Sequence, residues 1–491
     1  MTGMLSVGLA VLIGWLLVRS AGARVGLKPR WAVWLFEVAL GVGSGIGLTS
    51  AVYFLLLVGQ IASPAAIYIT DSLLLLVAAG LLWRRRQAKP AVEASGVEPA
   101  AGFRWNWVLG LALLLGWLAV VSALVEVAQA NPHGAWDAWS IWNLRAKFLA
   151  GPGKTWENAV SPLLGRTHPD YPLLLSGFVA RVWKASSDTG TLVPVVTGFL
   201  FAGSAVGLLF GALALLRGVS SALLAGLVML AGTTYLVEST TQYADVPLSF
   251  YYLATLALVL LGDTSAPGAR GRILAMAGAC ASCAAWTKNE GMIFLALSLG
   301  CYFLMEWRAS GLKEAFERWR FLVLGALPGL LLVVWFKFFL APPTDPLLRQ
   351  TALKAAQKLG DLGRYAQIGK ALLAEAVNFG GGVTHPLLLL AILGFALRFR
   401  AEERYKRPVL YSSVTLALVF ASYLAVYLIT PSDLAWHLGT SLGRLCCQLW
   451  PGFLLVAFMV LGRLEDATVV EARVAGRRAV RAKRKERGGR N

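Results

Sequence analysis

Apolar runs long enough to cross a lipid bilayer recur along most of this 491-residue chain. A helix needs roughly 20 apolar residues to span the hydrocarbon core. Thirteen runs approach that length, the eleventh being the shortest: residues 3–18, 33–58, 65–83, 106–128, 190–216, 220–238, 243–262, 272–287, 290–305, 321–340, 386–398, 408–429 and 445–462. Continuous runs of this kind cross bilayers as helices, which bond their own backbone groups. The sequence therefore predicts an all-α, polytopic membrane protein with about 13 transmembrane helices.

The chain is too poor in charged residues to cover a soluble core. Charged residues make up 14% of the sequence and hydrophobic residues 57%, whereas roughly 25% of an ordinary soluble domain is charged. A cytosolic enzyme, a secreted domain and a disordered chain are therefore excluded, and membrane lipids are the expected surroundings.

Lysine and arginine are distributed unevenly between alternate connections. The connections that follow the odd-numbered runs, together with the tail 463–491, hold 31 of the 45 basic residues. Because basic loops stay in the cytoplasm, we expect a multi-pass protein of the cell (inner) membrane with its N-terminus outside and its C-terminus cytoplasmic. The net charge of +19 then reflects topology and attraction to lipid headgroups, so nucleic acid is not an expected partner.

The polar motifs collect in the other set of connections. Residues 129–189 and 341–385 form long extracytoplasmic loops in which short helices are expected, and residues 430–444 form a shorter one. All four histidines of the chain lie in these loops or at their edges: His133, His168, His385 and His437. We expect accessory transmembrane helices over 1–105, a functional core over 106–462 and a basic tail over 463–491.

The first long loop contains an acid in a stretch rich in tryptophan. From Trp136 onward no helix breaker interrupts apolar residues at helical spacing, which predicts an amphipathic helix lying flat at the membrane surface. Asp137 falls in its first turn and could meet a substrate that arrives in the bilayer, or could only stabilise the helix dipole. Arg145 and Lys147 are expected to reach lipid headgroups or a phosphate.

The same loop ends in His168-Pro169-Asp170-Tyr171-Pro172. The two prolines predict an extended, rigid approach into the next helix. His168 and Asp170 could bind a divalent metal together with Asp137, but no tight ligand cluster is visible, so a metal is possible and not favoured.

Ionisable residues also occur at membrane depth, where an unpaired charge costs several kcal/mol. Asp245 begins the seventh run, and Lys288 and Glu290 lie between the eighth and ninth. Lys288 could form a structural ion pair with either acid, or could face an aqueous cavity and bind an anion such as a phosphate. Arg444 enters the last run from the outer side, where it either snorkels to the interface or clamps a phosphate.

In their order along the chain these motifs resemble the GT-C superfamily of membrane glycosyltransferases, specifically the group similar to glycosyltransferase family 39 and the protein mannosyltransferases. The resemblance covers residues 106–462. Its elements are Trp136-Asp137-Ala138-Trp139 in a surface helix, the His168–Leu173 stretch, Asp245 near a helix start, Thr287-Lys288 followed by Asn289-Glu290-Gly291, and Arg444 ahead of Pro451. The family often has Asp-Glu where this chain has Asp137-Ala138.

The resemblance implies a GT-C-like core that moves a sugar from a polyprenyl-phosphate donor to an acceptor on the extracytoplasmic face. Asp137 would then be the general base, and attack opposite the leaving phosphate would invert configuration. The implied substrate-binding residues are His168, Asp170, Tyr171, Asp245, Lys288, Glu290, His437 and Arg444, with Trp139 or Trp142 stacking on a sugar. The donor sugar and the acceptor stay open.

Two other classes fit parts of the sequence. Glu37 and Asp71 lie inside the second and third runs and could relay protons in a secondary transporter or pair with hydroxyl groups. Such a transporter often shows two similar halves, and no internal repeat is visible here. A lipid-linked-polymer ligase or a non-catalytic scaffold is the remaining alternative.

Overall fold

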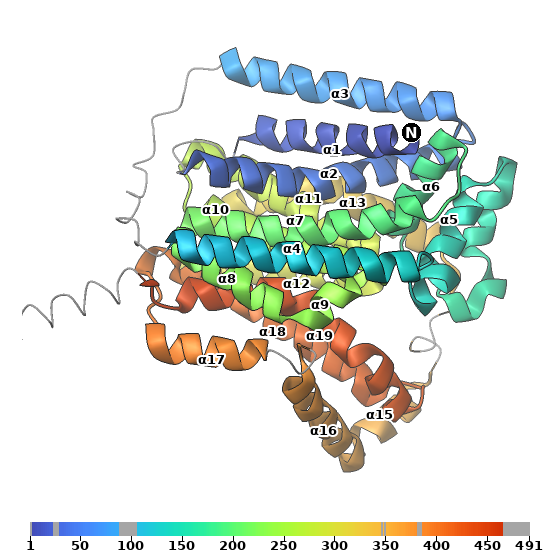
Figure 1. Ribbon diagram of the computed structural model, residues 1–491. Helices are drawn as coiled ribbons and strands as arrows, with labels where there is room; N and C mark the ends of the chain where they lie inside the picture. Colours follow the sequence, from blue (N-terminus) through green and yellow to red (C-terminus); the bar gives the residue numbers. More distant parts are fainter. Residues whose placement is uncertain are drawn as a thin grey trace, which may run out of the picture.

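The structure is a computed structural model that describes residues 2–22, 29–87, 106–344, 347, 350–380 and 385–464. These residues form a bundle of long helices that lie side by side with their axes roughly aligned (Figure 1). The bundle helices are α1 (Thr2–Ala21), α2 (Arg30–Val58), α3 (Pro64–Gln87), α4 (Asn106–Ala130), α7 (Leu192–Leu216), α8 (Val219–Ala231), α9 (Thr233–Glu238), α10 (Asp245–Asp263), α11 (Pro267–Thr287), α12 (Asn289–Ser310), α13 (Leu312–Phe339), α17 (Pro386–Leu397), α18 (Lys406–Ile429) and α19 (Leu434–Val460).

Shorter helices lie outside the bundle: those of the first loop are at its right end in Figure 1, and those of the second loop lie below it. The first predicted loop folds into η1 (Ala138–Trp142), α5 (Asn143–Ala150), η2 (Gly153–Val160), η3 (Pro162–Thr167) and α6 (Leu174–Ser186), and the second contains α15 (Ala352–Leu359) and α16 (Leu362–Asn378). One further short helix, η4 (Glu403–Tyr405), precedes α18. The part of the chain that the structure describes contains no β-strand, and the prediction of an all-α fold is confirmed.

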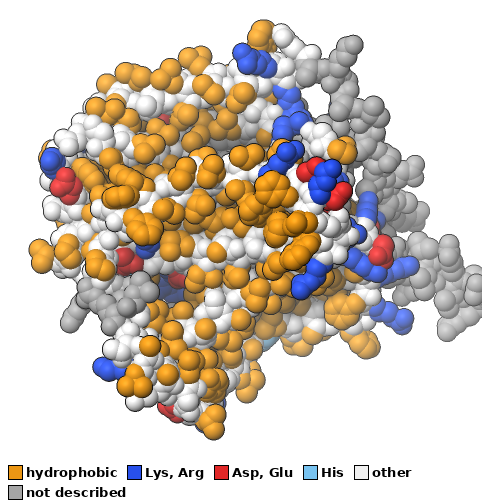
Figure 2. All heavy atoms as spheres, turned by 180° about the vertical axis from the view of Figure 1, so that it is seen from behind, with side chains coloured by type: hydrophobic (Ala, Val, Ile, Leu, Met, Phe, Trp, Pro, Cys, Tyr) orange, Lys and Arg blue, Asp and Glu red, His pale blue; other side chains and the backbone are white. Residues whose placement is uncertain are grey.

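Ten of the described helices are long and apolar enough to cross a membrane. They are α1–α4, α7, α10, α12, α13, α18 and α19. The chain is therefore a multi-pass membrane protein, as predicted. Large apolar side chains coat its flank, and lysine and arginine gather toward one end of it (Figure 2), so the flank suits contact with membrane lipids.

The predicted count of thirteen spans is not confirmed, because three of the runs fall short of these criteria. The sixth run is broken at Gly232 into α8 and the six-residue α9. The eighth run forms α11, in which Arg270 and Arg272, together with glycine and serine residues, lower the mean hydropathy. The eleventh forms α17, whose 12 residues cover only about 18 Å at 1.5 Å per residue.

The helix α10 forms the centre of the bundle. Every residue in its most apolar 18-residue window is buried, which is expected of a helix that is apolar all round. Pro247 lies in its first turn, where a missing backbone donor costs nothing. At that end α10 carries one charged residue, Asp245, which is also buried.

The first two helices pack into the same core as the later ones. Val7 of α1 and Phe36 of α2 belong to one continuous apolar cluster with residues of α10 and α19. Tyr53 of α2 also donates a hydrogen bond to the carbonyl oxygen of Leu149 in the first loop (2.8 Å). Helix α2 therefore supports the first loop directly, although the predicted division at residue 105 remains a prediction.

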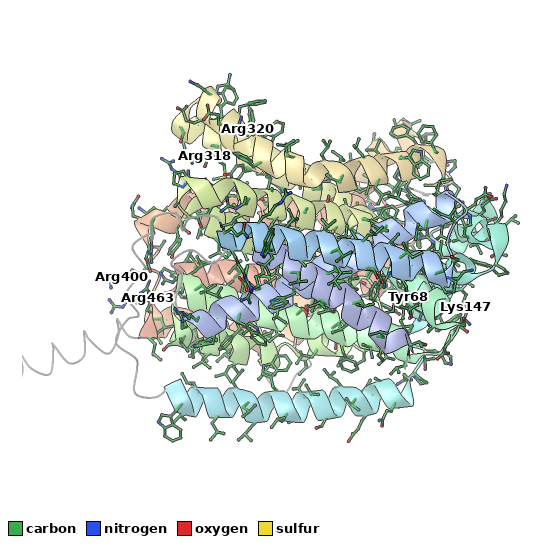
Figure 3. The ribbon with its side chains drawn as sticks, turned by 90° about the horizontal axis from the view of Figure 1, so that it is seen from above. Tyr68, Lys147, Arg318, Arg320, Arg400 and Arg463 are labelled. Atoms are coloured by element: carbon green, nitrogen blue, oxygen red, sulfur yellow. The ribbon has the colours of Figure 1, made fainter. Side chains whose placement is uncertain are left out.

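The two ends of the bundle differ in charge. Arg318, Arg320, Arg400 and Arg463 lie at one end, and Lys147 of the first loop lies at the other (Figure 3). The N-terminus of α1 lies at the same end as the first loop (Figure 1). The described chain thus begins and finishes at opposite ends, and the basic tail beyond Leu464 lies outside the described residues.

Helices α11 and α13 approach so closely that Gly278 and Gly325 cannot carry a side chain. A Cβ atom on Gly278 would lie 1.9 Å from the carbonyl oxygen of Leu322, and one on Gly325 would lie 1.8 Å from that of Ala275. Small residues permit this kind of contact in membrane helices, where packing replaces the hydrophobic effect. The contact joins α11, which ends beside Lys288, to the long helix α13.

We predict that Gly278→Ala lowers stability by about 1–3 kcal/mol, because the added methyl group forces the two backbones apart. Gly80→Ala in α3 is the matched control, since a Cβ there meets nothing within 4 Å. Thermal unfolding of the purified protein in detergent measures both variants. Equal melting temperatures would show that α11 and α13 can separate freely.

Candidate active site

A buried carboxylate organises the polar groups at the N-terminal end of α10. The side chain of Asp245 is 1% exposed. Its Oδ1 accepts hydrogen bonds from Lys288 Nζ (3.1 Å) and Gln448 Nε2 (2.5 Å), and its Oδ2 accepts two from Arg444, through Nε (3.1 Å) and Nη2 (2.8 Å). Two cations and an amide therefore satisfy a charge that would otherwise be costly at this depth.

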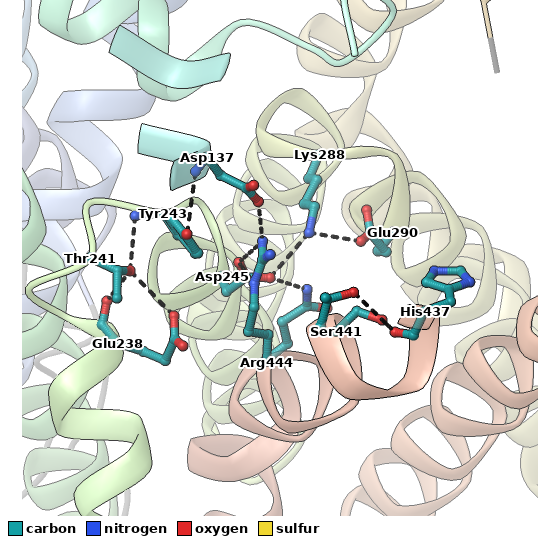
Figure 4. A network of polar contacts seen from close by, with 12 residues as sticks. Asp137, Glu238, Thr241, Tyr243, Asp245, Lys288, Glu290, His437, Ser441 and Arg444 are labelled. Atoms are coloured by element: carbon teal, nitrogen blue, oxygen red, sulfur yellow. Dashed lines mark hydrogen bonds and ion pairs between the residues drawn. The ribbon is translucent and has the colours of Figure 1, made fainter. Parts of the chain in front are cut away.

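Each of the two cations also holds a second carboxylate. Arg444 Nη2 lies 2.7 Å from Asp137 Oδ2, and Lys288 Nζ lies 2.9 Å from Glu290 Oε1. The five side chains form an alternating series, Asp137–Arg444–Asp245–Lys288–Glu290, which we call the charge chain (Figure 4). Both ends of the charge chain are carboxylates.

The charge chain is buried in the middle and accessible at its ends. The side chains of Asp137, Arg444 and Glu290 are 17%, 19% and 19% exposed, against 7% for Lys288. With every group ionised, three negative charges face two positive ones. A ligand can therefore reach the outer members without displacing Asp245.

The residues of the charge chain come together because of where the helices that carry them begin and end. Lys288 is the extended residue between α11 and α12. The last helix begins at Leu434 and not at residue 445 as predicted, because Asp433 caps it by accepting a hydrogen bond from the backbone of Trp436 (2.8 Å). Most of the predicted loop 430–444 is therefore helix, and Arg444 lies in its third turn.

Asp137 is positioned by the turn that precedes α10. The hydroxyl of Tyr243 accepts a hydrogen bond from the backbone N–H of Asp137 (3.2 Å), and the guanidinium of Arg444 lies over the ring of Tyr243, 4.4 Å from its centroid. Gln242 donates to the carbonyl of Pro132 (3.0 Å) and accepts from Asn143 (2.9 Å). Tyr243 thus touches both members of the outer ion pair, a role that the sequence did not reveal.

The predicted helix is present as η1 and α5, and its tryptophans lie in different surroundings. Its place at the membrane surface stays a prediction. Trp139 is 52% exposed and packs edge to face on Trp136, at a centroid distance of 5.8 Å. Trp142 is 1% exposed, and the ring of Tyr171 stacks on it at 5.8 Å. A sugar could stack on Trp139 as the fold stands, whereas stacking on Trp142 would require Tyr171 to move.

His168 and Tyr171 form a second aromatic stack beside the charge chain. Their ring centroids are 4.5 Å apart. The chain turns here, since the backbone of Tyr171 donates to the carbonyl of His168 (3.0 Å) and His168 has a left-handed φ of 48°. The predicted extended approach is therefore wrong over residues 168–171, where the two prolines flank a turn. Lys288 Nζ lies 6.0 Å from the ring of Tyr171.

Asp170 serves to connect the two long loops. One carboxylate oxygen accepts from Asn289 Nδ2 (2.9 Å) and lies 3.6 Å from Lys337 Nζ, and the other accepts from Thr344 (3.4 Å). Lys337 also donates to Asn289 Oδ1 (2.7 Å). Asp170 is 4% exposed, so in this arrangement it holds the segment that carries Lys288.

Arg145 has a structural role, which corrects its predicted reach toward headgroups or phosphate. It is completely buried and donates hydrogen bonds to the carbonyl oxygens of Ala159 (3.0 Å), His168 (3.5 Å) and Pro169 (3.2 Å). Lys147 is exposed.

His437 lies on the Glu290 side of the charge chain (Figure 4). Its Nδ1 is 3.0 Å from Thr430 Oγ1. Among the described residues no group of three or more His, Cys, Asp or Glu side chains could hold a metal ion, so His168, Asp170 and Asp137 form no such group.

A buried hydrogen-bond series behind Asp245 was not predicted. Tyr423 donates to Gln448 Oε1 (2.6 Å), and the hydroxyls of Tyr423 and Tyr252 are 3.2 Å apart. Because the Gln448 amide donates to Asp245, the series favours the ionised carboxylate. The sequence feature from which this series could have been predicted is Gln448, a polar residue inside an apolar run.

Comparisons of the chain with protein-family models, curated proteins and solved structures found no match.

We predict that Asp245→Asn destabilises the protein by about 3–5 kcal/mol, since buried Lys288 and partly buried Arg444 lose their shared counter-ion. Asp137→Asn should cost less than about 1 kcal/mol, because its ion pair is partly solvated. Thermal unfolding of the two variants gives the comparison. Similar losses for both would mean that Asp245 is not the central support.

Burial lowers the pKa of His168 below its usual value of 6.5, although Asp170 opposes the shift. The unfolded chain therefore binds this proton more readily, and stability falls as the pH drops through 6.5. We predict that the wild type loses more stability than His168→Asn between about pH 7.5 and 5.5; asparagine tolerates the left-handed backbone. Parallel pH dependences of the melting temperature would contradict this.

Proposed function

We propose that the chain is a membrane glycosyltransferase that moves a sugar from a polyprenyl-phosphate donor to an acceptor hydroxyl on the extracytoplasmic face, with inversion. The observation that carries the proposal is the charge chain, in which Arg444 and Lys288 share Asp245 while the accessible carboxylate of Asp137 lies against Arg444. A pair of fixed cations beside a carboxylate suits a reaction in which a phosphate leaves and a hydroxyl loses a proton.

Phosphate binding would change the partner of Arg444. Arg444 holds Asp137 at 2.7 Å, so this carboxylate is engaged. A donor phosphate competes for the same guanidinium, which can form two parallel hydrogen bonds to phosphate oxygens. Asp245 keeps Arg444 in place during the exchange, and Asp137 is released beside the bound donor.

The released Asp137 takes the proton of the acceptor hydroxyl as its oxygen bonds to the anomeric carbon. The bond between that carbon and the phosphate oxygen breaks, and its electron pair leaves with the lipid phosphate. Arg444 and Lys288 stabilise the charge that grows there, an effect worth about 3 kcal/mol per donor. Attack from the face opposite the phosphate inverts the anomeric configuration.

The same proposal includes the orientation in the membrane. Positive loops remain cytoplasmic, so the arginine-rich end of the bundle would face the cytoplasm of a cell with an inner membrane. The charge chain and the N-terminus of α1 would then face outward. The apolar flanks of the bundle would accommodate the polyprenyl tail beside ordinary lipids.

The transporter interpretation receives less support. Its strongest sequence feature was the pair of buried acids Glu37 and Asp71. Asp71 forms an ion pair with buried Arg181, and Glu37 lies 3.7 Å from Arg19. Each acid therefore has an internal counter-ion and requires no transported one.

We predict that Asp137→Asn lowers sugar transfer by about 10²–10⁴-fold, since the amide cannot accept the proton. The variant should still bind polyprenyl phosphate, and more tightly than the wild type, because Arg444 no longer has a competing carboxylate. Transfer from a panel of polyprenyl-phosphate-linked hexoses and pentoses measures the first effect, and binding of the bare carrier measures the second.

Glu157→Gln is the matched control, an exposed acid of the same loop that should leave both quantities unchanged. Normal transfer by Asp137→Asn would show that another group accepts the proton. If the wild type transfers no sugar from any donor in the panel, the proposed function itself is wrong.

A further inference from the structure

Glu290 has a buried carboxylate oxygen that nothing in the described part of the chain satisfies. Its Oε1 is held by Lys288 at 2.9 Å, whereas its Oε2 is buried and has no hydrogen-bond partner. The two oxygens of this side chain therefore differ, since one closes the charge chain and the other points away from it without a donor.

Such an oxygen is costly unless a donor reaches it. A buried acceptor without a hydrogen bond loses about 1–3 kcal/mol, and more when it is charged. Native structures leave few buried polar atoms unpaired, and those that remain unpaired require an explanation. A bound group that carries an O–H would satisfy this oxygen.

The charge around Glu290 favours a neutral donor over a second anion. The charge chain carries one more carboxylate than cations, and Lys288 is already shared between Asp245 and Glu290. A phosphate is therefore better placed at the other end, where Arg444 is 19% exposed. The two ends thus suit different chemical groups.

The surroundings of Oε2 fit a hydroxyl-rich ligand. Lys288 Nζ lies 6.0 Å from the centroid of the Tyr171 ring and 2.9 Å from Glu290 Oε1. His437 lies on the Glu290 side of the charge chain (Figure 4). Polar aromatic groups around a carboxylate can bond several hydroxyls at once.

We propose that Glu290 Oε2 accepts a hydrogen bond from a hydroxyl group of the transferred sugar, so that Glu290 determines which sugar is accepted. This inference rests on the proposed function, because it assigns the phosphate to Arg444 at one end of the charge chain and the sugar to Glu290 at the other. Loading of the site would then require both ends to be filled by one donor molecule.

The test compares two ligands in detergent: bare polyprenyl phosphate, and the sugar-bearing carrier from the hexose and pentose panel that the wild type binds best. We expect Glu290→Gln and Glu290→Ala to bind the sugar-bearing carrier about 10- to 100-fold more weakly, the usual loss for a hydrogen bond to a charged group. Both variants should bind the bare carrier as well as the wild type or better. Glu157→Gln is the control and should match the wild type with both ligands.

Deoxy analogues of that sugar sharpen the result. One hydroxyl should matter in the wild type and no longer matter in Glu290→Ala, which identifies it as the group that Glu290 bonds. An equal loss of both ligands would overturn the inference and leave Glu290 as a support for Lys288. No loss of either ligand would overturn it too.

The proposed function and this inference fail in different ways. If the wild type binds neither ligand, both are wrong. If the wild type binds both ligands and transfers sugar but Glu290→Ala retains its preference for the sugar-bearing carrier, only the assignment of Glu290 is wrong.

Discussion

A single buried carboxylate determines where the other polar groups of this membrane protein can lie. Asp245 starts a helix that is buried along its whole length, so its charge must be neutralised by neighbours within hydrogen-bond distance. Lys288 comes from the break between α11 and α12, and Arg444 comes from the third turn of α19. The remaining N–H groups of Lys288 and Arg444 then bind the partly exposed carboxylates of Glu290 and Asp137, respectively. The arrangement of the five charged side chains therefore follows from the need to neutralise the buried charge of Asp245.

The general architecture could be predicted because bilayer thickness is a strong constraint. Runs of apolar residues and the bias of arginine and lysine indicated a polytopic helical protein with a polar outer end. The number of spans was less certain, because the apolar run over 220–238 gives no sign of the break at Gly232 that divides it into α8 and α9.

The candidate site was predictable only as a set of residues. Asp137, Asp245, Lys288 and Arg444 were singled out because charge is rare in apolar sequence, and the structure brings all four together. Their pairing could not be predicted, since it depends on contacts between distant segments. For the same reason Tyr243 and Gln448 were missed, and Asp170 proved to be bonded to Asn289 and Lys337.

Arg145 holds the first loop in a way that tolerates changes in the sequence of that loop. Within the described part of the chain, its guanidinium donates to three main-chain carbonyl oxygens, those of Ala159, His168 and Pro169. Every amino acid supplies that acceptor, so side chains along this stretch can be exchanged while the anchorage persists. Variation there would alter the surface of the first loop and leave its attachment to α5 in place.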